Sequence, residues 1–181
     1  WMYKCAETSS LAWDPYPTSL RVVNWIKALQ EDQLFPDGYL DNLYLQCEIL
    51  NRRIEWHLQG NHLFTNAKAL VVAGLYFKTK RSEKWFKNGS NILLNELQEQ
   101  ILDDGGHFEL SPMYHAIILE DCLDLYNFLN AYPASGPKVD QLISLLDAKI
   151  KKMLFWISKM SFNNRYSHFN DSTGGIAVDL S

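Results

Sequence analysis

Apolar residues recur every three or four positions through most of this chain, which is the spacing of helices that bury one face. Six helices are predicted, over about residues 18–30, 42–59, 62–78, 83–102, 112–131 and 138–160. Turn-forming residues separate them, as in Pro36-Asp37-Gly38. No segment has a convincing strand period, and the tail from Asn163 to Ser181 is expected to be a loop. The pattern therefore predicts an all-α protein.

Several helix ends carry capping residues. Ser111 followed by Pro112 is typical of a helix start, because Ser caps the first N–H groups and Pro fits the first turn. Pro15 and Pro17 are expected to hold an extended segment before the first helix, which Thr18 or Ser19 would then cap. Gly60 is expected to end the second helix.

The third and fifth helices are the most apolar, and each begins with an unusually polar segment. Helices joined by short loops pack antiparallel, so alternate helices point the same way. The starts of these two helices should then open on a common face, with Asn61 and His62 near Tyr114 and His115. This arrangement is typical of an incomplete (α/α) toroid built of antiparallel helix pairs.

Composition excludes several classes of protein. The chain has 181 residues, 47% of them hydrophobic, which is enough for a buried core and excludes a disordered protein. A formal charge of −4 argues against a general nucleic-acid surface, and no apolar run has the length of a membrane span. Cys5, Cys47 and Cys122 are interpreted as small core residues. A start on Trp before Met indicates that the true N-terminus lies upstream.

The two polar segments place polar and titratable side chains at helix N-termini. Unpaired N–H groups and the positive end of the helix dipole favour an anion there, so Asn61, His62 and Tyr114 indicate a site for a negatively charged substrate. The alternative for His62 is a helix-cap or core histidine. The dipole is also expected to favour the phenolate form of Tyr114. No metal is expected, because a helix stop at Gly60 separates His57 from His62.

Four further residues are substrate-binding candidates: His107, Glu109, His115 and Arg53. His107 and Glu109 are either substrate contacts or a pair that fastens the loop, and His115 is interpreted mainly as a residue that orients its neighbours. Arg53 belongs to a predicted solvated helix face, with contact to an anionic sugar as the alternative. Trp25, Trp56 and Trp85 are interpreted as core residues rather than sugar platforms.

Four segments together resemble the N-terminal helical domain of heparinase II/III-like polysaccharide lyases, a family that includes alginate lyases of the same architecture. They are WDPYPTS (13–19), EWHLQGNHLFTNAKAL (55–70), DGGHFELSPMYH (104–115) and FNDS (169–172). The resemblance covers nearly the whole chain. It implies an (α/α) toroid lyase that cleaves a uronate-containing glycan, heparin/heparan-like or alginate-like, by β-elimination. It further implies that Asn61 and His62 contact the uronate carboxylate and that Tyr114 transfers protons.

In this family a β-sandwich domain follows the toroid and adds a His or Tyr to the cleft. Residues 1–181 are therefore expected to form part of the toroid domain, with the C-terminal β-sandwich absent from this chain and needed for full activity. The resemblance implies no cofactor in this segment, an anionic polysaccharide as partner, and a periplasmic or secreted location.

Two other functions are weighed against the lyase. In a non-catalytic glycan-binding or scaffolding module, the helical domain would only bind the glycan. A toroid glycoside hydrolase would need two opposed carboxylates. Its candidates are Glu109 and Asp121, but one lies in a loop and the other two turns into a helix. The hydrolase is therefore disfavoured.

Overall fold

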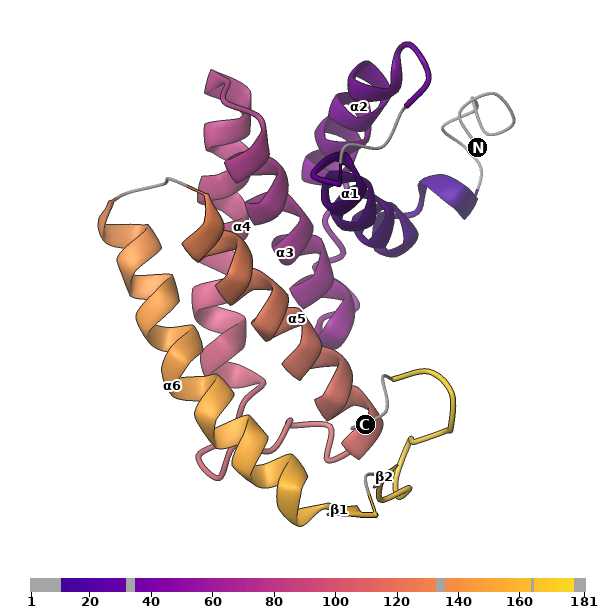
Figure 1. The fold of residues 1–181 in the computed structure, drawn as a ribbon, viewed down its shortest axis with the longest axis vertical. Coiled ribbons are helices and arrows are strands. Elements are labelled where there is room, and N and C mark those ends of the chain that lie inside the picture. Colours follow the sequence, from indigo (N-terminus) through magenta and orange to yellow (C-terminus); the bar gives the residue numbers. More distant parts are fainter. Residues whose placement is uncertain (1–10, 32–34, 133–135, 164, 178–181) are drawn as a thin grey trace. The chain divides into compact units, whose positions relative to one another are not determined.

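A computed structural model describes residues 11–31, 35–132, 136–163 and 165–177. Six α-helices make up most of these residues, in agreement with the all-α prediction (Figure 1). The elements are η1 (a 3₁₀ helix, Leu11–Trp13), α1 (Pro15–Leu29), α2 (Tyr39–Arg52), α3 (Gly60–Tyr76), α4 (Lys80–Glu99), α5 (Pro112–Ala131), α6 (Pro137–Lys159), β1 (Ser161–Phe162) and β2 (Arg165–Tyr166). The two short strands pair antiparallel, and β2 lies within the tail that was predicted to be a loop.

The start of α5 agrees with the prediction, and the start of α1 does not. Ser111 is the N-cap of α5, and its Oγ accepts the Tyr114 N–H at 3.3 Å, with Pro112 as the first helical residue. In α1, however, Pro15 and Pro17 lie inside the first turn. The first N–H groups of a helix have no partner within it, so a proline there loses nothing and already has a helical φ.

The second helix ends earlier than its apolar period predicts. α2 stops at Arg52 rather than near Gln59, and Gly60 begins α3 instead of ending α2. The Glu55 N–H donates to the side-chain oxygen of Asn66 at 3.0 Å, and this contact takes the place of a helical bond. A tertiary contact therefore overrides the local pattern.

By its contacts the chain divides into two compact units, Trp1–Ile92 and Leu93–Ser181. In the first unit α1 packs against α2 and α3 (Figure 1). α3, predicted to be one of the two most apolar helices, is buried almost all round, since its residues from Leu63 to Ala73 are all buried. α4 approaches α3 closely: a Cβ placed on Gly74 would lie 2.8 Å from the backbone of Phe86. Glycine is therefore what allows these two helices to touch.

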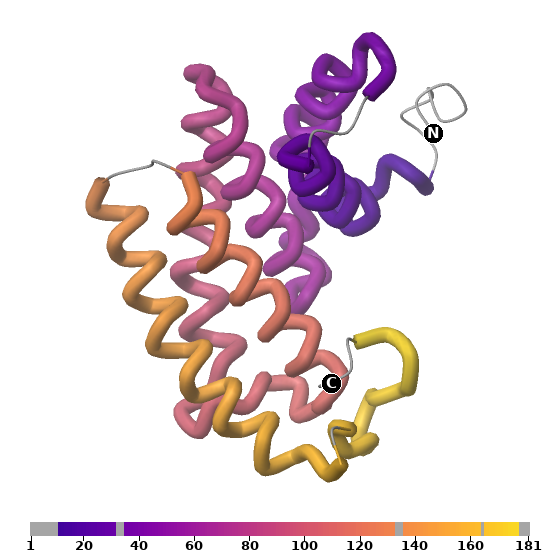
Figure 2. The backbone as a smooth tube through the Cα atoms, in the orientation of Figure 1, coloured from indigo at the N-terminus to yellow at the C-terminus, as the bar shows by residue number. Residues whose placement is uncertain are grey.

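In the second unit α5 and α6 pack side by side (Figure 1). They run antiparallel, because His115 at the start of α5 contacts Met153 near the end of α6. The loop from α4 into α5 passes close to the C-terminal half of α6 (Figure 2). Gly105, with a φ of 92°, lies directly against the backbone of Lys152 there.

The burial of individual side chains tests the core residues predicted from the sequence. Cys47 and Cys122 are fully buried, as expected of small core residues, whereas Cys5 lies outside the described residues. Trp85 is a core residue at 1% exposure, but Trp56 is 60% exposed, so the core assignment of Trp56 is wrong. Trp56 follows the early end of α2 and so loses its place on a helix face. In the part of the chain that the structure describes, no helix is long and apolar enough to cross a membrane.

Candidate functional site

The first turn of α3 carries the two residues predicted to hold an anion. Asn61 and His62 are both partly exposed, and the His62 side chain is 37% exposed. The N–H groups of this turn have no partner within the helix and α3 is otherwise apolar, so its start has the polarity that attracts a negative group. Both residues lie at a helix start, as predicted.

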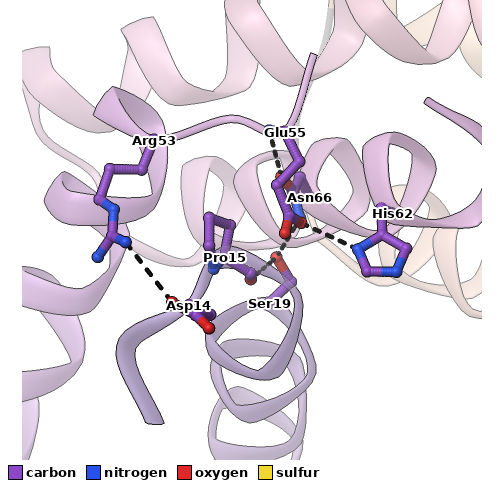
Figure 3. A network of polar contacts seen from close by, with 7 residues as sticks. All are labelled: Asp14, Pro15, Ser19, Arg53, Glu55, His62 and Asn66. Carbon is purple, nitrogen blue, oxygen red and sulfur yellow. Dashed lines mark hydrogen bonds and ion pairs between the residues drawn. The ribbon is translucent and has the colours of Figure 1, made fainter. Parts of the chain in front are cut away.

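A buried carboxylate lies behind His62 (Figure 3). Glu55, whose side chain is 10% exposed, has its Oε2 3.3 Å from the Nδ1 atom of His62. The same Oε2 accepts an N–H from the side chain of Asn66 at 3.1 Å, and Asn66 is fully buried. His62 is therefore held on its inner side by a group that the sequence analysis did not single out.

Further contacts connect this carboxylate to α1. The Asn66 amide also donates to Ser19 Oγ at 3.1 Å, and Ser19 Oγ donates to the Pro15 carbonyl at 2.8 Å. The ring of Tyr16, from the same first turn of α1, lies 4.5 Å from the His62 ring between centroids. The first turn of α1 therefore supports His62 through Pro15 and Tyr16.

Arg53, a predicted substrate-binding residue, is already engaged within this unit. Its guanidinium donates to the Trp13 carbonyl at 3.2 Å and lies 3.6 Å from the Asp14 carboxylate (Figure 3). The Arg53 side chain is still 45% exposed. It lies just beyond the end of α2 and not on a helix face.

The backbone that enters α3 is strained. Gln59, the residue before the helix, has φ 53° and ψ −152°, a conformation that is almost restricted to glycine. Such strain is retained where the surrounding contacts determine the backbone, and here those contacts are the ones around Glu55 and His62. The strained residue therefore lies next to the candidate anion site at the start of α3.

At the start of α5, the tail of the chain packs against the helix cap. Ser111 Oγ donates to the Asp171 carbonyl at 2.8 Å and lies 2.8 Å from Ser172 Oγ. Asn170 donates its side-chain N–H to the Leu110 carbonyl at 2.6 Å. The FNDS segment therefore binds the cap of α5.

Tyr114 follows the cap and is partly buried. Burial raises its pKa above the ordinary value, and the negative charges of Asp171 and Glu109 raise it further. The expectation that the helix dipole favours the phenolate is therefore wrong in this environment, because burial and two nearby carboxylates favour the neutral phenol. Tyr114 is a protonated donor at neutral pH.

The two histidines near Tyr114 are core residues. His107 and His115 are both 0% exposed, which corrects their prediction as substrate-binding residues, since a direct contact needs an accessible atom. His107 Nε2 lies 3.1 Å from Gln100 Oε1, and His115 Nε2 lies 3.1 Å from the Met153 carbonyl, with its ring stacked on Trp156. The fastening alternative fits His107, although its partner is Gln100 and not Glu109.

Both imidazoles are uncharged. Burial lowers the pKa of His107 to about 3, with a smaller contribution from nearby His115, and burial lowers the pKa of His115 to about 4. The Nδ1 atom of each ring is buried without a hydrogen-bond partner among the described residues, as an unprotonated nitrogen would be. Of the four substrate-binding candidates, Glu109 and Arg53 are the accessible ones.

The structure thus brings the candidates together in two groups. Asn61, His62 and Arg53 lie in the first unit, while Tyr114 and Glu109 lie in the second. That the two groups face one cleft stays a prediction. Among the described residues, no three His, Cys, Asp or Glu side chains are placed to hold a metal ion.

Sequence reasoning missed the residues that support the two groups, chiefly Glu55, Asn66 and Asp171. Asn66 had a usable signal, because it lies four residues after His62 on a helix that is otherwise apolar, and a buried amide needs polar partners. Glu55 had none, since it was placed inside a predicted helix.

The chain is similar in sequence to heparin-sulfate lyases. The heparin-sulfate lyase of Bacteroides stercoris is 34% identical over 111 residues, which are 58% of this chain and 15% of that protein. The heparin-sulfate lyase of Bacteroides thetaiotaomicron is 32% identical over 118 residues, 62% of this chain and 17% of that protein.

Solved structures show the same fold. A crystal structure of heparinase III matches with a TM-score of 0.72 and 22% identity, over 98% of this chain and 28% of that one. A mutant of the heparan sulfate lyase from Pedobacter heparinus matches with a TM-score of 0.69 and 23% identity, over 93% of this chain and 27% of that one. The likeness confirms the predicted fold class, an incomplete (α/α) toroid. This chain spans only 15% to 28% of the length of the proteins described here.

The family described as Heparinase II/III N-terminus matches residues 2–178. Since that match takes in nearly all of the sequence, the chain belongs to the heparinase II/III family and corresponds to its N-terminal region.

Proposed function

We propose that the protein containing this chain is a polysaccharide lyase that cleaves a heparin- or heparan-sulfate-like glycan by β-elimination. The observation that carries the proposal is the start of α3, where a partly exposed imidazole and an amide lie at the positive end of a buried helix. The relatives at 32% and 34% identity, both heparin-sulfate lyases, support the choice of glycan.

β-Elimination needs a proton to leave the carbon beside the uronate carboxylate. That proton is hardly acidic while the carboxylate is ionised, so the enzyme has to neutralise the carboxylate as charge develops. In our proposal the Asn61 amide, the His62 imidazole and the N–H groups of the first turn of α3 bind it. Their effect is largest in the transition state, in which the negative charge moves onto the carboxylate.

Tyr114 acts in the proposal as the acid. When the glycosidic C–O bond breaks, its electron pair goes to the leaving oxygen, which takes the phenol proton, and the carbon–carbon double bond forms as the ring proton is removed. The raised pKa of Tyr114 keeps this proton in place beforehand. The base is then the His or Tyr that the β-sandwich domain contributes in this family, and Tyr114 regains its proton from solvent.

This proposal requires the starts of α3 and α5 to face one cleft and the β-sandwich domain to complete it. Because glycan polymers of this kind lie outside cells, it also implies a periplasmic or secreted protein. The alternative, a glycan-binding module without catalysis, would keep the anion site at α3 and need no acid. A hydrolase is disfavoured further because Asp121, one of its two carboxylates, is buried.

Product absorbance tests the proposal directly. The full protein incubated with heparan sulfate should release oligosaccharides with an unsaturated end that absorbs in the ultraviolet, and Asn61→Ala should lower kcat and not only raise KM. Binding of heparan sulfate without any unsaturated product would favour the glycan-binding module instead.

A further inference from the structure

We propose that Glu55 is the residue that positions His62, fixing a proton on its inner nitrogen so that the outer nitrogen, Nε2, is the atom presented to substrate. The inference rests on the proposed function for the identity of the substrate, a glycan carboxylate. It concerns a residue outside the anion-binding and proton-transfer set.

The geometry around Glu55 leaves one arrangement of donors and acceptors. The Glu55 N–H donates to Asn66 Oδ1 at 3.0 Å, so the amide oxygen of Asn66 faces that N–H. The Asn66 nitrogen must then be the donor to Glu55 Oε2 at 3.1 Å. Asn66 thus forms hydrogen bonds with both the backbone and the side chain of Glu55. These two bonds fix the position of the carboxylate in the absence of any substrate.

The carboxylate in turn determines which nitrogen of His62 is protonated. A carboxylate oxygen accepts hydrogen bonds and does not donate them, so the Nδ1 atom 3.3 Å from Oε2 must carry a hydrogen. The other ring nitrogen points away from Glu55 (Figure 3). Nδ1 is therefore committed to the protein, and Nε2 is left for a ligand.

A carboxylate ligand adds a second requirement. To donate to it, Nε2 needs a hydrogen as well, and only the imidazolium has hydrogens on both ring nitrogens. Glu55 is the hydrogen-bond acceptor that this form needs on its inner side, 3.3 Å from Nδ1. Glu55 then matters for catalysis without touching the substrate.

Charged and polar groups lie near this pair. Asp14 and Arg53 pair with each other at 3.6 Å (Figure 3). The Tyr16 ring lies 4.5 Å from the His62 ring between centroids. Asn66 and Ser19, the polar neighbours in contact with each other, are uncharged. Glu55 is the carboxylate in contact with the imidazole among the described residues.

The first test needs no activity. In the full protein, isotope-labelled at the histidine ring nitrogens, the NMR spectrum should show a protonated Nδ1 on His62, assigned by the signal that His62→Gln removes. In Glu55→Gln the neutral ring should become a mixture of its two tautomers. A wild-type His62 with an unprotonated Nδ1 would overturn the proposal even if no variant folds.

The second test is the split between kcat and KM. Glu55→Gln keeps the shape and an acceptor oxygen but removes the charge, so kcat should fall about 10-fold to 100-fold while KM changes less. A purely structural role would lower stability and leave the kcat of the folded enzyme unchanged, which would also overturn the proposal.

Glu48→Gln is the matched control. Glu48 is a carboxylate of similar burial in the same unit, 16% exposed, and it pairs with Arg81 at 2.9 Å and with Arg52 at 3.3 Å. The Glu48→Gln variant should leave both the His62 spectrum and kcat unchanged. If the full protein has no lyase activity, the NMR result still decides the role of Glu55, so the two proposals fail separately.

Discussion

At the start of α3 an imidazole is partly exposed and has a carboxylate behind it, whereas at the start of α5 two imidazoles are buried and a phenol lies near two carboxylates. The same kinds of side chain therefore have different surroundings. The Glu55 carboxylate lies 3.3 Å from the ring of His62, while burial lowers the pKa of His107 and of His115 and raises the pKa of Tyr114. The first helix start suits binding of an anion, and the second suits holding a proton.

The two helix starts also share a backbone feature. Each follows a non-glycine residue with positive φ, Gln59 before α3 and Leu110, at φ 54°, before α5. The other such residues among those described are Asn163 and Asn170 in the tail, and asparagine tolerates this conformation better. Strain in Gln and Leu at these two positions distinguishes them from the other helix starts that the structure describes.

The largest effect should come from removing the proton that the start of α5 holds. Tyr114→Phe keeps the ring but not the transferable proton, so the rate of product formation should fall at least about 100-fold. Tyr126→Phe, on the same helix, is the control and should have normal activity. Near-normal turnover by Tyr114→Phe, with unchanged helicity, would leave α5 with only a structural role.

The next effect concerns how the loop into α5 is held against α6. A Cβ at Gly105 would press on the Lys152 carbonyl, and the φ of 92° disfavours any side chain. Gly105→Ala should therefore lower the free energy of unfolding by about 2–4 kcal/mol. Gly174→Ala is the control, because its Cβ would meet nothing closer than His168 at 3.9 Å. Thermal unfolding followed by circular dichroism compares them; equal midpoints would contradict the close approach.

Acid should destabilise the second unit through its buried imidazoles. The folded-state pKa values of about 3 and about 4 lie below the usual 6.5, so the unfolded chain binds more protons between these values and stability falls as pH falls. At pH 5 the loss should be about 2 kcal/mol for each histidine. The measurement is denaturant unfolding at pH 7 and pH 5.

Two substitutions sharpen that measurement. His107→Gln should reduce the pH dependence by about half, since one of the two groups no longer titrates. His57→Gln, at an exposed position, should leave it unchanged. An unchanged slope in His107→Gln would mean that the ring is accessible to protons in the folded protein.

The smallest effect is relief of strain before α3. Gln59→Gly should stabilise the protein by about 0.5–1 kcal/mol, because the relaxed backbone outweighs the added freedom of the unfolded chain. The same substitution in a helix, Gln141→Gly in α6, should instead destabilise it by about 0.5–1 kcal/mol. If both variants lose stability, Gln59 makes a contact that compensates for its conformation.

Local pattern was enough to predict the helices and one helix cap. The apolar period gave the six helices, and Ser111 with Pro112 gave the start of α5, because both signals act within a few residues. The end of α2 was not predictable in this way, since it depends on Asn66, eleven residues after Glu55. The period through Ile54 and Leu58 suggested a longer helix.

In the candidate site, too, features marked by local sequence were predictable and features set by distant contacts were not. Asn61, His62 and Tyr114 were identifiable because glycines, a cap and the family motifs mark helix starts. The burial of His107 and His115 depends on packing against α6, and the charge near Tyr114 depends on Asp171 in the tail. Contacts so distant in sequence leave no local pattern.

The contact between the tail and the cap of α5 also sets an order of assembly during synthesis. Asp171 follows Ala131, the last residue of α5, by 40 residues, which a ribosome translating about 5–20 residues per second covers in about 2–8 s. Throughout that interval the nascent chain can contain α5 but not the carboxylate of Asp171. Tyr114 therefore acquires its final electrostatic surroundings as one of the last events in the biosynthesis of this segment.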